Sequence, residues 1–376
     1  MAKRGLVVLG STGSIGSQTL DTVRAFPDAF DVVGLAAGNN LDLLSQQVEE
    51  FRPRLVCCAN GASAQASFGE ARMTPMEEMV CDPAVETVMV GTTGRAGLIP
   101  TFRALEEGRS VCLANKEVII MAGQMISELA DRSEGKLLPV DSEPSAIWQC
   151  LRGEDQPIRR LIITASGGPF RNTPPEELER VTPEQALKHP TWKMGRRITI
   201  DSSTLMNKGF EVIEAHWLFG VSWEQIEVVV HPQSLIHSMV EFADGSVKAQ
   251  MGPPDMRLPI QYSLFYPNRL PNDAIPKLDI GVAMSMTFEP MEPERYPCFS
   301  LALEAGRQGA TYPAVLSAAD EVAVELFLGR QIPFTDIPKV VGQTLEDHRP
   351  GNAGNLEEVL ATDEWARARA REVAGR

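Results

Sequence analysis

The stretch that decides the fold spans residues 5–16 and reads GLVVLGSTGSIG. Its first five residues form an apolar run typical of a buried strand, and its last seven open an amphipathic segment typical of a helix. The glycines at positions 10, 13 and 16 have the spacing G-x-x-G-x-x-G. Glycines let a backbone turn tightly and approach a pyrophosphate at a helix N-terminus. We therefore expect a strand–turn–helix unit that binds a dinucleotide; the alternative is that the glycines serve a tight turn alone.

Short apolar runs alternate with amphipathic segments through the first third of the chain. The expected strands are Gly5–Leu9, Val32–Ala36, Leu55–Ala59, Thr87–Val90 and Val111–Leu113. The amphipathic segments between them include Ser17–Ala25 and Asp42–Phe51. Alternation of this kind is typical of a parallel sheet with helices on both faces. The sequence therefore predicts an α/β fold whose N-terminal part is a Rossmann-like, doubly wound parallel sheet.

The pattern changes after about Asp141, where strands no longer precede long helices. We expect strands at Leu161–Thr164, Arg197–Ile200 and Ile226–Val230, and a hairpin in which Asp244-Gly245 joins Ile236–Phe242 to Ser246–Met251. Prolines then concentrate, and the pattern is helical from about Phe299 onward. The predicted organisation is a Rossmann-like domain (1–140), a central α+β domain (141–263), a proline-rich linker (264–298) and a C-terminal helical bundle (299–376).

The composition limits the partners and the compartment. The 376 residues include 43% hydrophobic side chains and carry a formal net charge of −15, which suits a globular protein but repels nucleic acid and anionic membranes. The six cysteines form no C-x-x-C pair, which indicates thiols in a reducing compartment. No apolar run has the length of a membrane span, and Met1–Gly10 leads into a strand without a signal peptide. We expect a cytoplasmic protein with no nucleic-acid or membrane partner.

The loop after the second expected strand bears on the choice of cofactor. It reads Ala37-Gly38-Asn39-Asn40. NAD sites usually carry Asp or Glu here, where the carboxylate binds the ribose. The missing acid favours NADP, because a carboxylate would repel the 2′-phosphate. No Arg or Lys stands at the turn either, so the group that binds the 2′-phosphate stays open.

Three carboxylates form a candidate metal site. Lys136–Asp141 reads as a strand that runs into Asp141-Ser142-Glu143, and residues i and i+2 of a strand face the same side. Glu211 lies near the start of a later helix. Carboxylates without a His or Cys cluster suit a hard divalent cation such as Mg²⁺ or Mn²⁺. The alternatives are that Glu211 complements a helix dipole and that the other two are solvated loop residues.

Three further segments offer groups that bind anions. Ala165-Ser166-Gly167-Gly168 follows a strand, Asp201-Ser202-Ser203 follows a second one, and Asn207-Lys208-Gly209 opens a helix. Hydroxyls, bare backbone N–H groups, an amide, an ammonium and a helix N-terminus together predict a phosphate pocket. Ordinary turn and N-cap chemistry explains any one of these segments taken alone.

The segment Lys188–Arg197 is loop-like and basic in an acidic protein, and it contains His189, Trp192, Lys193 and Met194. A lid over an anionic substrate would use His and Lys for charge and Trp and Met to exclude water. The alternative is a surface loop with one packed Trp. We expect the remaining histidines of interest to be structural: His231 and His237 in a strand-rich region, and His216 on an apolar helix.

Seven strings, read in order, resemble those of the 1-deoxy-D-xylulose 5-phosphate reductoisomerase family. They are Gly10–Gly16, LANKE at 113–117, PVDSEP at 139–144, TASGGPF at 164–170, Lys188–Gly195, MNKGFE at 206–211 and HPQSLIHSMV at 231–240. Members of this family rearrange a keto sugar phosphate and reduce the resulting aldehyde with NADPH, giving 2-C-methyl-D-erythritol 4-phosphate for isoprenoid synthesis. The resemblance implies that activity, NADPH and Mg²⁺ or Mn²⁺ as cofactors, and a homodimer.

The resemblance also assigns roles to individual residues. The metal ligands it implies are Asp141, Glu143 and Glu211. The substrate contacts it implies are Lys116, Ser142, Glu143, Ser166, His189, Trp192, Met194, Ser202, Asn207, Lys208 and Glu211; of these, Lys116, Glu143, His189 and Glu211, together with Asp141, are the catalytic set. The cofactor contacts it implies are Thr12, Gly13, Ser14, Ile15, Gly38, Asn39, Asn40, Asn115, Glu117 and Gly195.

Two other functions compete with this interpretation. A plain NADP-dependent dehydrogenase of another small phosphorylated carbonyl compound would bind the same cofactor, would not isomerise its substrate, and would work at full rate without a divalent ion. A non-catalytic NADPH-binding regulator would bind the cofactor without turnover and would have no use for three convergent carboxylates.

Overall fold

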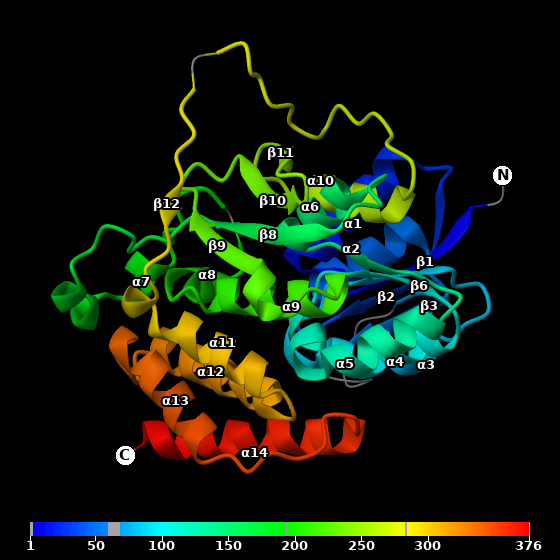
Figure 1. Cartoon of the computed structure of the whole chain (residues 1–376). Helices are drawn as coiled ribbons and strands as arrows, with labels where there is room; N and C mark the ends of the chain where they lie inside the picture. The colour runs from blue at the N-terminus through cyan, green and yellow to red at the C-terminus, as the bar shows by residue number, and fades with distance from the viewer. Residues whose placement is uncertain (1–2, 59–67, 193, 283, 376) are drawn as a thin grey trace. The chain divides into compact units, whose positions relative to one another are not determined.

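The computed structural model describes residues 3–58, 68–192, 194–282 and 284–375 (Figure 1). The chain divides into two compact units. The first contains Met1–Val118, Ile126–Ser145 and Asp255–Pro276, and the second contains Ile119–Met125, Ala146–Pro254 and Lys277–Arg376. Both units are therefore assembled from segments that are distant in sequence.

The first unit is built on a seven-stranded parallel sheet with the order β4-β3-β2-β1-β5-β6-β7. The strands are β1 (Arg4–Leu9), β2 (Phe30–Ala37), β3 (Leu55–Cys58), β4 (Arg72–Met73), β5 (Thr87–Val90), β6 (Ser110–Leu113) and β7 (Leu137–Pro139). The doubly wound parallel sheet predicted from the sequence is confirmed, with all five expected strands present; Ala59, the expected end of the third, lies outside the described residues.

Helices connect these strands in the pattern of a doubly wound fold. They are α1 (Ser14–Ala25), α2 (Leu41–Phe51), α3 (Met76–Met79), a 3-10 turn at Gly94–Gly97, α4 (Leu98–Glu106), α5 (Lys116–Arg132) and α10 (Arg257–Phe265). Figure 1 shows α3 and α4 on one face of the sheet and α1 and α10 on the other. The strand order reverses at β1, between β2 and β5, and ligands of such sheets bind at the carboxyl ends of the strands at this point.

The second unit contains a five-stranded mixed sheet with the order β11-β10-β8-β9-β12. Its strands are β8 (Ile158–Ala165), β9 (Ile226–Val230), β10 (Ile236–Phe242), β11 (Val247–Met251) and β12 (Glu289–Pro290). The predicted hairpin is confirmed: β10 and β11 pair antiparallel, and Gly245 turns the chain with φ +87°. A mixed sheet in the central part of the chain agrees with the expected α+β character.

Helices make up the rest of the second unit. They are α6 (Ser142–Leu151, shared with the first unit), α7 (Pro183–Ala186), α8 (Arg196–Ser203), α9 (Met206–Phe219), α11 (Pro297–Gln308), α12 (Tyr312–Leu328), α13 (Ile337–Glu346) and α14 (Leu356–Ala374), with 3-10 turns at Pro175–Arg180, Trp223–Gln225, Pro293–Arg295 and Phe334–Asp336. α9 packs on the sheet through Val212 and Ala215 and on the helices through Phe210 and Ile213. It therefore links two hydrophobic cores of the unit.

The predicted strand at Arg197–Ile200 is wrong, because this segment forms helix α8. The β-branched residues Ile198, Thr199 and Ile200 fit an alternating strand pattern. In the structure Gly195 is the N-cap, and its carbonyl oxygen accepts hydrogen bonds from the N–H group and the hydroxyl of Thr199. Tertiary packing of the buried face outweighed the local strand propensity.

All six cysteines are free: Cys58, Cys112, Cys150 and Cys298 are buried, and Cys57 and Cys81 are partly buried. Burial raises the pKa of the Cys112 thiol to about 11, and it has the same effect on Cys150. Within the described ranges, no helix combines the length and the apolar content that a membrane span requires.

Two glycines inside helices provide a stability test. A Cβ on Gly209 of α9 would lie 2.4 Å from Ala302 Cβ on α11, whereas a Cβ on Gly342 of α13 would have its nearest neighbour at 3.7 Å. We expect Gly209→Ala to lower the free energy of unfolding by about 1–3 kcal/mol because the two helices must separate. Gly342→Ala should raise it by about 0.5–1 kcal/mol through helix propensity alone. Urea unfolding measures both; stabilisation by Gly209→Ala would contradict the tight contact.

Candidate active site

The glycine turn between β1 and α1 is shaped to bring backbone N–H groups to an anion. Gly10 has φ +83°, and a Cβ atom there would lie 2.4 Å from Gly91 O. A Cβ on Gly16 would lie 2.2 Å from Gly10 O. α1 begins after Gly13 without a side-chain cap and without an acidic residue in its first turn. Its N-terminus therefore offers backbone donors and the positive end of the helix dipole to a pyrophosphate.

Two further groups of residues expected at the cofactor lie at the same edge of the sheet. Thr12 and Ile15 are partly buried and Ser14 is exposed in the turn after β1, and Gly38–Asn40 is exposed after the neighbouring strand β2. Asn40 also caps α2, because its Oδ1 accepts a hydrogen bond from the Leu43 N–H at 3.2 Å. The structure thus brings both turns together, and the Asn40 side chain also has a structural role as the N-cap of α2.

A third group of predicted residues follows β6. Asn115 is 2% exposed and donates hydrogen bonds from Nδ2 to Thr92 Oγ1 at 3.1 Å and to Gly94 O at 2.9 Å. Its amide therefore ties the loop after β5 to the start of α5. Lys116 and Glu117 are the first residues of that helix; Lys116 is 6% exposed and forms an ion pair with Asp141.

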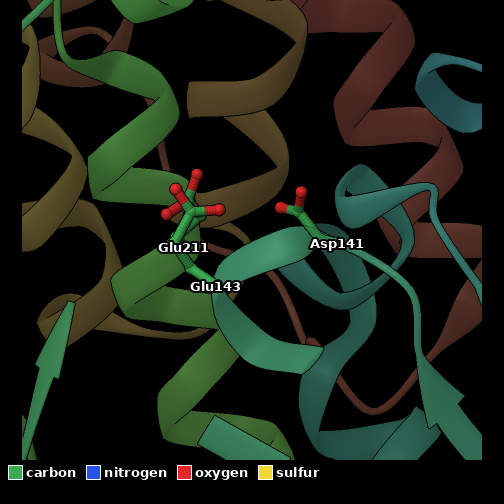
Figure 2. A group of neighbouring side chains, drawn as sticks. All are labelled: Asp141, Glu143 and Glu211. Carbon is green, nitrogen blue, oxygen red and sulfur yellow. The ribbon is translucent and has the colours of Figure 1, made fainter. Parts of the chain in front are cut away.

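The three predicted carboxylates come together, as Figure 2 shows. Asp141, Glu143 and Glu211 each offer one carboxylate oxygen, and these atoms all lie within 4.8 Å of one another. Asp141 is 8% exposed and Glu211 is 1% exposed. Three hard oxygen ligands without sulfur or imidazole suit Mg²⁺ or Mn²⁺.

The secondary structure predicted around Asp141 and Glu143 is wrong in one respect. Lys136–Asp141 is not a continuous strand, because β7 ends at Pro139 and α6 begins at Ser142. Asp141 and Glu143 converge because the chain turns into a helix between them, and Glu143 lies in the first helical turn. Glu211 lies in the second turn of α9, one turn after the first residue of the helix.

Hydrogen bonds and cations compensate the charge of the cluster. The Ser142 hydroxyl donates to Glu143 Oε2 at 2.6 Å, and its N–H donates to Asp141 Oδ1 at 3.0 Å. Asn207 Nδ2 donates to Glu211 Oε1 at 2.6 Å, and Lys208, which is 4% exposed, pairs with Glu211 Oε2. Buried carboxylates require such partners, because an uncompensated charge in the interior is costly.

A second cluster joins two residues predicted for the phosphate pocket to a histidine predicted for the lid. His189 Nε2 lies 3.0 Å from Ser166 Oγ and 3.1 Å from Ser202 Oγ. His189 Nδ1 accepts hydrogen bonds from the N–H groups of Thr191 at 3.2 Å and Trp192 at 2.9 Å. Two donors at Nδ1 assign the imidazole proton to Nε2, so this nitrogen donates towards the serine hydroxyls.

Two glycines let the loop after β8 approach α8. Gly167 and Gly168 have φ +82° and +68°, and a Cβ on Gly168 would lie 2.7 Å from Ser202 O. The Gly168 N–H donates to Ser166 Oγ at 3.2 Å. Ser166 and Ser202 are therefore held side by side from two separate elements, and Asn207 and Lys208 follow in the first turn of α9.

The loop predicted as a lid contributes His189 to this cluster. Trp192 and Met194 are partly buried, and the Trp192 ring lies 5.8 Å from the His237 ring. Gly195 is exposed and caps α8. Lys193, which was expected to add charge to the lid, lies outside the described residues.

The histidines outside this cluster have structural contacts. His231 is fully buried: one ring nitrogen accepts from the N–H groups of Leu235 and Ile236, and the other bonds to Thr287 O at 2.9 Å. His216 contacts Val221 O at 2.6 Å and stacks on Trp223. His237 packs against Trp192, a contact that sequence reasoning missed because no local motif joins a strand residue to a distant loop.

Comparison with known protein families covers most of the chain. The family described as 1-deoxy-D-xylulose 5-phosphate reductoisomerase matches residues 6–123. The 1-deoxy-D-xylulose 5-phosphate reductoisomerase C-terminal domain matches 137–219, and the DXP reductoisomerase C-terminal domain matches 251–369.

Individual relatives align with this chain over almost their full length. The 1-deoxy-D-xylulose 5-phosphate reductoisomerase of Pelotomaculum thermopropionicum is 51% identical, with 97% of each chain covered, and that of Chlorobaculum tepidum is 50% identical, with 99% of this chain and 100% of the relative covered. The enzyme from Zymomonas mobilis in complex with NADPH has a TM-score of 0.90 at 40% identity, and 99% of each chain is covered. A DOX-P reductoisomerase in complex with NADPH, fosmidomycin and magnesium has a TM-score of 0.95 at 35% identity, covering 99% of this chain and 98% of that one.

The carboxylate cluster makes a direct prediction about metal binding. Glu211→Gln should weaken Mn²⁺ binding by at least about tenfold, because it removes one of three anionic oxygens and leaves Lys208 close to the ion. Electron paramagnetic resonance of free Mn²⁺ measures the affinity without substrate or turnover. Glu224→Gln, on an exposed 3-10 turn, is the matched control and should bind Mn²⁺ like the unmodified protein. Equal affinities in both variants would remove Glu211 from the site.

Proposed function

The chain belongs to the 1-deoxy-D-xylulose 5-phosphate reductoisomerase family, and from this premise we propose which of its residues carry the reaction. The reaction is the NADPH- and metal-dependent conversion of 1-deoxy-D-xylulose 5-phosphate into 2-C-methyl-D-erythritol 4-phosphate. The observation that carries the proposal is the carboxylate cluster of Asp141, Glu143 and Glu211. A plain reductase has no need of it, whereas moving a carbon–carbon bond requires strong polarisation of the substrate oxygens.

The first unit fits NADPH. Its glycine turn leaves no room for a Cβ at Gly10 or Gly16, and its helix N-terminus carries no acid. We assign the pyrophosphate to Thr12–Ile15 and the adenosine end to Gly38–Asn40. Asn115, Glu117 and Gly195 are assigned to the nicotinamide end. When bound, NADPH supplies the hydride for the reduction.

The carboxylate cluster fits a divalent ion. Asp141, Glu143 and Glu211 would hold Mg²⁺ or Mn²⁺ through one oxygen each, and three solved structures of relatives contain magnesium. When bound, the ion acts as a Lewis acid on the substrate carbonyl and the neighbouring hydroxyl. The Ser142 hydroxyl, already bonded to Glu143, orients this carboxylate and contacts the substrate. Lys116, buried beside Asp141, stabilises oxyanion charge that develops on the substrate.

The second cluster fits the phosphate group of the substrate. Ser166 and Ser202 offer hydroxyls on either side of His189 Nε2, and Asn207 and Lys208 add an amide and a cation at the start of α9. A phosphate accepts from all of these donors, and Lys208 supplies positive charge in a chain of net charge −15. Holding the phosphate at one end fixes the reacting carbons relative to the carboxylate cluster, which lowers the entropic cost of the rearrangement.

The loop from Lys188 to Gly195 carries the water-excluding part of the site. His189 contacts the substrate from this loop, and Trp192 and Met194 cover it. Exclusion of water strengthens every charge interaction inside the site and protects the aldehyde intermediate. The Trp192 N–H bond to His189 Nδ1 couples the covering side chain to the residue that touches the phosphate end.

We also propose a homodimer that works in a reducing compartment such as the cytoplasm. The free cysteines support the compartment. The dimer is supported by exposed apolar side chains that alternate along the segment before β12: Ile280 at 77%, Val282 at 57%, Met284 at 37%, Met286 at 39% and Phe288 at 45%. A row of this kind on every second residue fits a strand-like surface that a second copy covers. The four-part division at 140, 263 and 298 is proposed as the functional organisation of the chain.

The reaction is tested by the loss of NADPH absorbance with 1-deoxy-D-xylulose 5-phosphate. We expect turnover that requires Mg²⁺ or Mn²⁺, stops with a chelator, and fails with NADH. Full activity in the presence of chelator would indicate the plain dehydrogenase. Measurable NADPH binding without turnover under any condition would indicate a cofactor-binding regulator and would overturn the assignment.

The dimer is tested by the mass in solution. The unmodified protein should have twice the chain mass of 41.1 kDa in size-exclusion chromatography with light scattering. The double variant Ile280→Asp, Phe288→Asp should run as a monomer, because two charges cannot be buried unpaired in an apolar interface. Ile99→Asp, at an exposed apolar position of α4, is the control and should stay dimeric. A dimer in both variants would place the interface elsewhere.

A further inference from the structure

A group of buried acids lies outside the active site, where α8 meets the C-terminal helices. Asp201 of α8 is 4% exposed and Asp320 of α12 is fully buried. The two acids are neighbours, because Oδ2 of each lies 3.8 Å from the guanidinium group of Arg197. Neither oxygen of Asp320 accepts a hydrogen bond from an N–H or O–H group of the described residues. Two buried carboxyl groups in contact cannot both be ionised at low cost.

The titratable groups around the pair come from four helices. On α8, Arg197 lies 3.8 Å from both Asp201 Oδ2 and Asp320 Oδ2, but its shortest ion pair, at 2.8 Å, joins Nη1 to Glu321 of α12. Glu321 in turn binds Arg367 of α14 at 3.0 Å.

Two further groups complete these surroundings. Arg367 also binds the buried Asp363 of α14 at 2.8 Å. The Cys298 thiol of α11 also faces the acids, and burial raises its pKa well above the usual value, so it stays neutral. Arg197 is thus shared among three acids, and Arg367 binds Glu321 and Asp363.

We propose that Asp201 and Asp320 share one proton, carried by Asp320, and that this neutralised pair fixes helix α8 so that Ser202 stands in the phosphate pocket. A proton on Asp320 supplies the missing donor for the contact between the two carboxyl groups. Burial raises the pKa of Asp320 well above its ordinary value, and the neighbouring Asp201 raises it further, while Arg197 opposes the shift.

The link to the pocket is short. Asp201 is followed directly by Ser202, whose hydroxyl contacts His189 and whose carbonyl oxygen lies against Gly168. Asp320 therefore acts through Asp201 as a positioning residue for the phosphate end of the substrate. This step rests on the proposed function, because it takes Ser202 as a phosphate ligand; the shared proton itself does not.

The first test measures stability against pH and needs no turnover. A carboxyl group whose pKa is higher in the folded than in the unfolded protein stabilises the folded protein at low pH. This stabilisation is complete below the pKa of the unfolded protein, about 3.9, and is lost as the pH rises towards the pKa of the folded protein. The unfolding equilibrium constant of the unmodified protein should therefore rise about tenfold per pH unit relative to Asp320→Asn in this window. Glu325→Gln, on the exposed face of α12, should show no such trend. A constant difference between Asp320→Asn and the unmodified protein from pH 5 to pH 9 would overturn the shared proton.

The second test separates positioning from fold. Asp320→Ala removes the proton donor and should raise the KM for 1-deoxy-D-xylulose 5-phosphate about tenfold, with the KM for NADPH changed less than about twofold. Asp320→Asn keeps an N–H donor without charge and should restore the KM. Inorganic phosphate binding, measured by calorimetry, should follow the same order in the three proteins.

The outcomes of these tests are distinct. A folded Asp320→Ala variant with unchanged substrate KM and unchanged phosphate binding would overturn the positioning role. If the unmodified protein binds phosphate but does not convert the sugar phosphate, the proposed function fails, and the phosphate and pH measurements still decide this inference. If Asp320→Ala does not fold, the Asp320→Asn variant decides the test. Its affinity for phosphate should remain constant at alkaline pH, whereas the affinity of the unmodified protein should fall.

Discussion

Mutual repulsion among Asp141, Glu143 and Glu211 is the constraint around which the site is arranged. Carboxylate oxygens within 4.8 Å of one another raise the energy of the folded chain unless positive groups compensate them. Lys116 and Lys208 provide that compensation at the first turns of α5 and α9, so both helices must begin where the acids converge. In the proposed function the same two lysines also bind the substrate. The buried charges that destabilise the folded chain therefore also produce a strong local electric field at the site.

The second cluster, which we propose as the phosphate site, faces a different electrostatic problem, because a protein of net charge −15 would have to attract a dianion there. It offers mainly dipoles, namely two serine hydroxyls and one imidazole N–H, while Lys208 lies in the first turn of α9. Such donors act at short range, where the global field matters least. Their placement therefore has to be accurate, and it is set by the packing of α8 against the loop at Gly168.

Much of this could be read from the sequence, for physical reasons that are local. The glycine turn and the strands beside it were predictable because buried parallel strands are continuous apolar runs, and Gly10 needs a left-handed φ. Helix α8 was missed because Ile198, Thr199 and Ile200 fit a strand equally well. Asp320 was overlooked because an acid in a helix usually faces solvent; only the contacts of four helices make it buried. The local sequence pattern fails to predict structure where tertiary packing determines the conformation or the burial of a residue.

The contact between Gly209 and Ala302 has a consequence for anyone who wishes to redesign this enzyme. α9 carries Asn207, Lys208 and Glu211, while its glycine lies against α11 with no room for an extra atom. The backbone of the ligand-bearing helix therefore cannot slide to accept a larger or differently shaped molecule. Altered specificity is then expected from the proposed lid at 188–195, whose described side chains are only partly buried or exposed. The helix is therefore the fixed frame of the proposed site, and the loop is its adjustable part.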